Sequence, residues 1–203
     1  MANYKVTYFD VNGGRAEPIR LALFIGGIAF EDERFGYAEF PEVKKRMPLA
    51  QVPVLTLDGQ QITQSSAILR YVGRLAELYP QDAYQALLCD EIIDSIEDVT
   101  GRIVMTFGLQ GDALKEARGK LVDNYLLPHL QWLTQKLEGK TFFVEERLTI
   151  ADLKTLAHLS WLNSGLLDHI DKTLVAEHAP VVQQYVMRLQ QHPQIVKYYQ
   201  QRA

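Results

Sequence analysis

The sequence is poor in the residues that build covalent cross-links and metal centres. It has one cysteine, Cys89, in 203 residues, which excludes an intramolecular disulfide framework and a cysteine-based metal cluster. Cys89 lies inside an expected helix and not at its N-terminus, so we interpret it as a small buried apolar residue. No two histidines have the i,i+3 or i,i+4 spacing of a helical metal site, so we expect no bound metal. The histidines are His129, His158, His169, His178 and His192.

Long hydrophobic runs and an excess of basic residues are also missing. The longest apolar run, residues 21–30, contains two glycines and falls short of the ~20 residues that span a bilayer. The first residues lack the basic and apolar regions of a signal peptide, which predicts a cytoplasmic protein. Lys and Arg number 21 against 25 Asp and Glu and are scattered, so neither nucleic acid nor a membrane surface is an expected partner.

The residues that are present describe a folded protein of one large or two small domains. Hydrophobic residues make up 47% of the chain and charged residues 23%. Up to about residue 78 the pattern alternates between β-rich and helical segments, and a right-handed parallel crossover should join the first two strands. The expected order is strand 3–9, helix 18–25, strand 29–35, short helix 41–46, strands 52–57 and 60–62, and a helix from residue 65.

Beyond Pro80 almost no strand signal is found, which predicts an all-helical second half. Residues 149–152, Thr-Ile-Ala-Asp, have the form of a capping box before a helix that is apolar on nearly every side. Such a helix belongs in the middle of a domain. We therefore expect two domains, 1–78 and 82–203, the second with helices over 82–109, 112–137, from 149, over 180–190 and from 193.

Four short segments of the first domain could carry chemistry. Tyr8 ends the first strand, Arg15 precedes the first helix, Val52-Pro53 enters the third strand, and Gln64-Ser65 begins the third helix. Taken singly, each has an ordinary structural interpretation, such as a strand aromatic, a surface charge, a turn or a helix cap. Residues 11–17 contain no cysteine, which argues against a thiol oxidoreductase.

Taken in order, these segments resemble a known family. The stretch Asn-Tyr-Lys-Val-Thr-Tyr-Phe is followed by Gly-Arg-Ala-Glu, Gln-Val-Pro-Val-Leu and Gln-Ser-Ser-Ala-Ile, and later by Thr-Ile-Ala-Asp in the helical half. Together they resemble a cytosolic glutathione transferase, and the first two segments most resemble the sigma class. The resemblance covers the whole chain. It implies a thioredoxin-like domain followed by an all-helical domain, glutathione as co-substrate, a role in detoxification and a homodimer.

The implied chemistry requires glutathione to bind as a thiolate. A thiol pKa of ~8.5 must fall by about two units for thiolate to dominate at pH 7, which needs about 2.7 kcal/mol. One or two hydrogen bonds to the charged sulfur, at about 1.5 to 3 kcal/mol each, suffice. By resemblance, Tyr8 is the catalytic donor and Arg15 adds positive potential. The thiolate would attack an electrophilic carbon of a hydrophobic substrate, although isomerisation or peroxide reduction could use the same nucleophile.

The resemblance also implies a binding site for the tripeptide. The helix N-terminus at Gln64 and Ser65 would hold the γ-glutamyl carboxylate, and a cis Pro53 would turn the backbone of Val52 toward the cysteinyl unit. Asp98 would reach across a homodimer to the γ-glutamyl amine. The glycyl end would meet Lys44 and Gln51, with Phe40 packed nearby, and the hydrophobic substrate would meet Phe9, Val11, Arg102, Met105 and Phe107.

Three departures from the family pattern bear on these expectations. Tyr8 and Arg15 stand one residue further apart than in the nearest sigma pattern, Phe40 replaces a Trp and Gln51 replaces a Lys. The last two should loosen glutathione binding. The alternative from another class is a non-catalytic relative of the same fold, either a ligand-binding or a crystallin-like structural protein. The short connection at residues 110–111 and the presence of Tyr8 argue against it.

Overall fold

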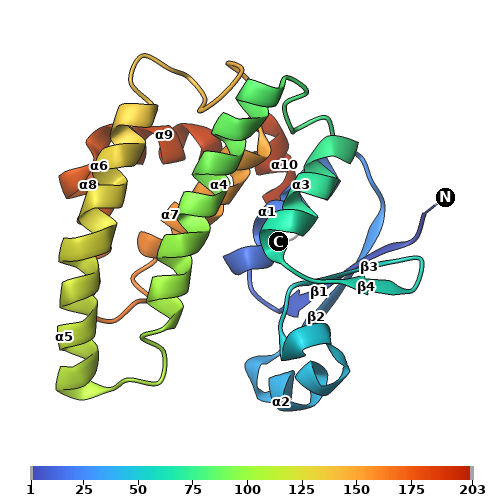
Figure 1. The fold of residues 1–203 in the computed structure, drawn as a ribbon, viewed down its shortest axis with the longest axis horizontal. Coiled ribbons are helices and arrows are strands. Elements are labelled where there is room, and N and C mark those ends of the chain that lie inside the picture. The colour runs from blue at the N-terminus through green and yellow to red at the C-terminus, as the bar shows by residue number, and fades with distance from the viewer. Residues whose placement is uncertain (1, 202–203) are drawn as a thin grey trace.

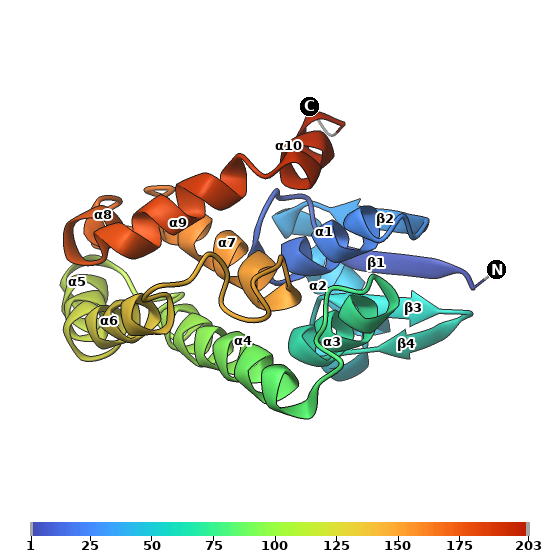
Figure 2. The ribbon, with the colours of Figure 1, turned by 90° about the horizontal axis from the view of Figure 1, so that it is seen from above.

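The N-terminal part of the chain is a four-stranded mixed sheet with helices on both faces. The computed structural model describes residues 2–201, and Figures 1 and 2 show its two parts side by side. The strand order is β2-β1-β3-β4. β1 pairs in parallel with β2, while β3 pairs antiparallel with both β1 and β4. The strands are β1 Tyr4–Phe9, β2 Phe30–Phe35, β3 Val54–Leu57 and β4 Gln60–Ile62.

The two faces of this sheet are covered by different helices. α1 (Glu17–Ile25) is the crossover between the parallel strands, begins with Pro18 in its first turn, and packs beside α3 (Ser65–Leu75). These helices cover the face that carries Val6, Tyr8 and Leu55. The opposite face carries Phe9 and Phe35 and packs against the short α2 (Phe40–Val43). Alternation along β1 therefore points Tyr8 toward the helices and Phe9 away from them.

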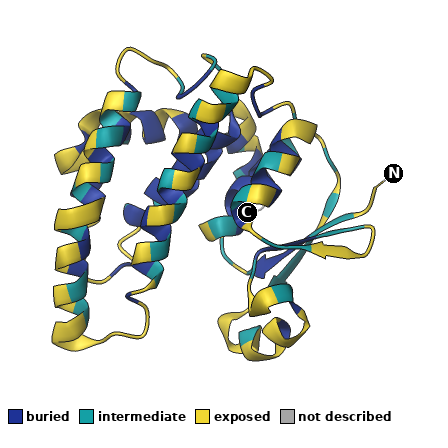
Figure 3. Cartoon of the chain, viewed as in Figure 1, coloured by how far each residue is buried: buried dark blue, intermediate teal, exposed yellow. Residues whose placement is uncertain are grey.

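The second part is all-helical and is built around α7, as the sequence predicts. Every residue of α7 is buried except Ser160 and Trp161, because the helix packs against α4, α9 and also α1. Figure 3 shows this helix in dark blue behind α4. The helices of the second part are α4 Ala83–Val104, α5 Gly111–Leu121, α6 Leu127–Lys136, α7 Ile150–Leu162, α8 Leu174–His178, α9 Pro180–Gln190 and α10 Pro193–Gln200.

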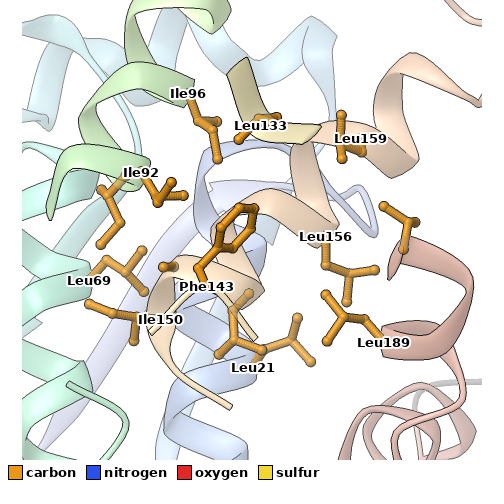
Figure 4. Packing of buried hydrophobic residues seen from close by; sticks show 14 of the residues in the cluster. Leu21, Leu69, Ile92, Ile96, Leu133, Phe143, Ile150, Leu156, Leu159 and Leu189 are labelled. Carbon is orange, nitrogen blue, oxygen red and sulfur yellow. The ribbon is translucent and has the colours of Figure 1, made fainter. Parts of the chain in front are cut away.

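Both parts share one hydrophobic core. The close view in Figure 4 shows Leu21 and Leu69 from the first part beside Ile150 and Leu156 from α7. A backbone hydrogen bond from the Ile150 N–H to the Leu78 carbonyl, 2.9 Å long, also joins the parts. The thioredoxin-like and all-helical fold class is confirmed, whereas the boundaries at residues 78 and 82 stay a prediction. Within residues 2–201, no helix combines the length and hydropathy needed to cross a bilayer.

Candidate active site

The Tyr8 hydroxyl lies under the turn that joins β1 to α1. Its oxygen accepts a hydrogen bond from the backbone N–H of Arg15 at 3.2 Å, and the side chain is 8% exposed. Gly14 crosses the ring with a φ of +68°, and a Cβ there would lie 2.6 Å from the hydroxyl oxygen. Because the amide occupies a lone pair of the oxygen, the hydroxyl hydrogen stays available for another acceptor. Although Tyr8 and Arg15 stand one residue further apart than in the nearest sigma pattern, the turn that contains Gly14 brings the Arg15 N–H within hydrogen-bond distance of the hydroxyl.

Burial keeps this hydroxyl protonated. Desolvation raises the pKa of Tyr8 above its usual value, and the amide and guanidinium of Arg15 offset part of the rise. A phenol that is protonated at neutral pH can donate to an anion but cannot act as a base. The local chemistry therefore suits a hydrogen-bond donor.

Arg15 belongs to a polar cluster that joins the turn before α1 to α3, α4 and α7. Its Nε donates to Oε1 of Glu97 on α4 at 2.5 Å. The other oxygen of that carboxylate accepts from Nζ of Lys154 on α7 at 2.6 Å and from the hydroxyl of Ser65 at 3.4 Å. The structure thus brings together three residues predicted from the sequence, Tyr8, Arg15 and Ser65, with two that the sequence analysis missed.

Attraction to two cations keeps Glu97 ionised. Burial raises the pKa of the Glu97 carboxyl, but the attraction of Lys154 and then of Arg15 outweighs this and lowers it. Burial lowers the pKa of Lys154, and its attraction to Glu97 opposes that shift. The Glu97 carboxylate therefore holds Arg15 as one partner of a charge-assisted pair.

The N-terminus of α3 has the features of an anion site. Gln64 precedes the helix with a φ of +72°, unusual for a residue other than glycine, and its side chain does not cap the helix. The first amides of a helix have no intrahelical acceptor and carry partial positive charge. The hydroxyl of Ser66 is buried without a hydrogen-bond partner in the described part of the chain. These donors fit the carboxylate of a bound peptide.

The other residues predicted to bind glutathione lie either in the segment before β3 or on α4. The Val52-Pro53 bond is cis, as expected, and Val52 is half-buried just before β3. Phe40 packs with its ring centroid 5.1 Å from Phe9, and Nζ of Lys44 lies 6.0 Å from the Phe40 centroid. Gln51 is exposed just before Val52 in the chain, and Asp98 is exposed on α4 next to Glu97.

The residues predicted for the hydrophobic substrate fall into two groups. Phe9 and Val11 lie at the end of β1, and the Val11 carbonyl accepts from Arg20 at 3.0 Å. Arg102, Met105 and Phe107 lie at and beyond the end of α4. There Met105 is 82% and Phe107 54% exposed, and the guanidinium of Arg102 stacks on Tyr125 at 4.0 Å. A shared pocket between the two groups stays a prediction.

Comparison with known proteins finds glutathione transferases that are similar to both parts of the chain. The sequence matches the models "Glutathione S-transferase, N-terminal domain" over residues 4–74 and "Glutathione S-transferase, C-terminal domain" over residues 97–202. A glutathione S-transferase of Anopheles gambiae is 30% identical over 98% of this chain and 96% of its own.

Two solved structures are similar along nearly all of the chain. Prostaglandin synthase D of Nilaparvata lugens has a TM-score of 0.88 and 25% identity, covering 99% of both chains. The sigma class glutathione transferase of Fasciola hepatica has a TM-score of 0.84 and 24% identity over 100% of this chain and 97% of its own, so the two proteins share a fold. Because the two domain models together match most of the chain and the Anopheles gambiae relative is 30% identical over 98% of it, the chain belongs to the glutathione S-transferase family.

Proposed function

We propose that the protein joins glutathione thiolate to hydrophobic electrophiles and that the Tyr8 hydroxyl donates a hydrogen bond to the sulfur. The observation that carries this proposal is the 3.2 Å bond from the Arg15 amide to the Tyr8 oxygen, which orients the hydroxyl and leaves its hydrogen free. One or two such bonds to a charged sulfur supply the about 2.7 kcal/mol that a two-unit fall in thiol pKa requires. The Arg15 guanidinium adds positive potential.

The peptide is held, in this proposal, along the edge of the N-terminal part. The N-terminus of α3 at Gln64 and Ser65 receives the γ-glutamyl carboxylate, and the backbone of Val52 pairs with the cysteinyl unit. Lys44 and Gln51 meet the glycyl end beside Phe40. The exposed position of Asp98 on α4 fits a contact with a second copy, so the proposal includes a homodimer that shares its glutathione sites.

Isomerisation is the second candidate, because the protein of known structure with a TM-score of 0.88 to this chain is named a prostaglandin synthase. In that reaction the thiolate would attack one oxygen of the endoperoxide, so that an S–O bond forms as the O–O bond breaks and the other oxygen takes up a proton. Loss of the proton on the carbon that carries the sulfur-bound oxygen would then break the S–O bond, give a carbonyl and release the thiolate, so the same Tyr8-stabilised sulfur would serve. Product analysis with a conjugation substrate and with a prostaglandin endoperoxide separates the two reactions, because only conjugation consumes glutathione.

The test is a pH titration of the thiolate absorbance of bound glutathione, for the native protein and for Tyr8→Phe. We expect the native thiol pKa to lie about two units below ~8.5 and to rise by about one to two units in the variant. Tyr4→Phe is the matched control, since Tyr4 lies on the same face of β1 at its other end. Tight binding with an ordinary thiol pKa would favour a ligand-binding protein, and no binding would remove the function.

A further inference from the structure

Lys154 is a lysine buried among the mostly apolar residues of α7. It lies in the first half of α7, is 4% exposed, and belongs to a run of ten consecutive buried residues from Ile150 to Leu159. Burial of an ammonium group is costly unless the group is paired, and a well-packed apolar side chain in its place often serves stability as well. The packing of α7 therefore does not by itself account for Lys154.

The partner of Lys154 connects it to the active site. Glu97 uses one carboxylate oxygen for Arg15, at 2.5 Å, and the other for Lys154, at 2.6 Å. We propose that Lys154 is a positioning residue: its ammonium group fixes the Glu97 carboxylate, which in turn holds the side chain of Arg15, the residue whose backbone N–H donates to the Tyr8 hydroxyl. This inference rests on the proposed function of Tyr8 and Arg15.

Arg15 alone holds Glu97 less well than the two cations together. The carboxylate is partly buried, which favours its neutral form, and the attraction of Lys154 is the largest effect that keeps it charged, ahead of Arg15. A neutral carboxyl group would bind the guanidinium only as an ordinary acceptor. Loss of Lys154 thus weakens the link between α4 and the turn above Tyr8.

The other ionisable groups near Lys154 do not replace Glu97. Asp94 lies one turn before Glu97 on α4 and attracts Lys154 more weakly than Glu97 does. Asp94 is exposed, and its carboxylate pairs with Arg70 at 2.6 Å. His158, one turn later on α7, is buried and neutral, because burial lowers its pKa to about 3. Asp98 lies next to Glu97 and is exposed. Glu97 is therefore the group through which Lys154 can act on Arg15.

The experiment compares Lys154→Met with the matched variant Lys136→Met. Lys136 also pairs with a glutamate of α4, Glu91, at 2.6 Å, but on α6. Both changes remove one lysine charge, and methionine preserves the length of the side chain. The readouts are the pKa of the bound glutathione thiol and the pH profile of kcat/KM. Lys154→Gln, uncharged and polar, is the second variant should the methionine fail to fold.

We expect Lys154→Met to raise the bound thiol pKa by at least about half a unit and to move the acid limb of kcat/KM to higher pH. Lys136→Met should leave both as in the native protein. In a Glu97→Gln background, Lys154→Met should have little further effect, because the two residues act as one unit.

A native thiol pKa that is lowered, together with unchanged values in both Lys154 variants, would overturn the inference and leave the proposed function standing. An additive effect in the Glu97→Gln background would overturn it as well, because Lys154 would then act directly. An ordinary thiol pKa in the native protein would instead overturn the proposed function and this inference with it.

Discussion

The Tyr8 hydroxyl is oriented by a backbone amide, and the conformation of Gly14 decides where that amide lies. Gly14 has a φ of +68° and follows Gly13, whose φ of 161° is extended backbone open to any residue. The carbonyl of Val11, earlier in the same turn, is held by Arg20 at 3.0 Å and Arg34 at 3.4 Å. Two guanidinium groups therefore hold the turn at the Val11 carbonyl. The turn comes close to the Tyr8 ring at Gly14, which has no side chain.

This arrangement predicts opposite results for two neighbouring glycines. In Gly14→Ala the new Cβ would lie 2.6 Å from the Tyr8 oxygen in a strained conformation, so the hydroxyl must shift. We expect kcat/KM to fall about tenfold or more, which corresponds to the loss of one hydrogen bond to the sulfur. At Gly13 a Cβ would meet no atom within 4 Å, and Gly13→Ala should stay close to native kinetics. Equal losses in the two variants would show that the turn does not position Tyr8.

Sequence reasoning identified the site residues that stand at the ends of elements in the N-terminal part. It missed those that lie inside the helices α4 and α7. Tyr8, Arg15 and Ser65 stand at the ends of predicted elements, where functional side chains gather. Glu97 and Lys154 lie within helices 82 and 139 residues after Arg15, and periodicity does not tell which helices meet. One signal was available: Lys154 interrupts a helix that is apolar on nearly every side, and a buried lysine requires a partner.

The cap at the N-terminus of α7 is the helix cap that the sequence predicts most directly. The Asp152 carboxylate accepts the Thr149 N–H at 2.6 Å, which is its part of the capping box, and it also accepts the Thr149 hydroxyl at 2.9 Å. It also accepts the Phe143 N–H at 3.3 Å and the Tyr185 hydroxyl, contacts that the motif alone does not reveal. One buried carboxylate thus ties α7 to the preceding loop and to α9.

Removal of this carboxylate should cost far more than removal of an exposed cap. Asp152→Ala leaves four donors without their acceptor in a buried site, and we expect a loss of about 3 kcal/mol or more in unfolding free energy. Asp82, the exposed cap of α4, accepts two hydrogen bonds within residues 2–201, from the Tyr84 and Gln85 amides. Asp82→Ala should cost about 1 kcal/mol. Urea denaturation of both variants measures the difference, and equal losses would mean that Asp152 acts only as a helix cap.

Element ends were harder to predict than elements. The helix expected over 82–109 ends at Val104, because the chain turns there and reaches Gly108 with a φ of +90°. The helix expected over 112–137 is interrupted by a π-helical turn, Val122–Leu126, just before Pro128, whose nitrogen has no hydrogen to donate. α8 escaped the sequence analysis since five residues are too few for a periodic pattern.

At the scale of the whole molecule, a buried histidine, His158, and a half-buried one, His129, couple stability to pH. His129 of α6 and His158 of α7 have ring centroids 6.3 Å apart, and their nitrogens meet the hydroxyls of Ser95 and Thr100 on α4 at 3.2 and 3.0 Å. Burial lowers the pKa of His129 to about 4 and that of His158 to about 3. The sequence places both in helices but gives no sign that they meet, because 29 residues separate them.

The direction of the pH effect follows from these lowered values. In the unfolded chain both rings gain a proton near ~6.5, whereas in the folded protein they stay neutral until much lower pH. The stability they contribute is complete above ~6.5 and falls as the pH drops from there toward the folded-state values, because the unfolded state binds more protons. Each histidine adds up to about 1.4 kcal/mol per pH unit to the slope in this window.

His158→Gln should therefore flatten the pH dependence of unfolding. Between pH 6 and 5, above the range where most carboxylates titrate, we expect the slope of unfolding free energy against pH to decrease by about 1 kcal/mol per unit, close to the contribution of one histidine. The matched control is His178→Gln, because His178 is exposed at the end of α8 and should leave the slope unchanged. Urea denaturation at several pH values gives both slopes. If His158→Gln kept the native slope, the His158 ring would have to accept its proton within the folded core, and its burial between α4 and α6 could not be what excludes the charge.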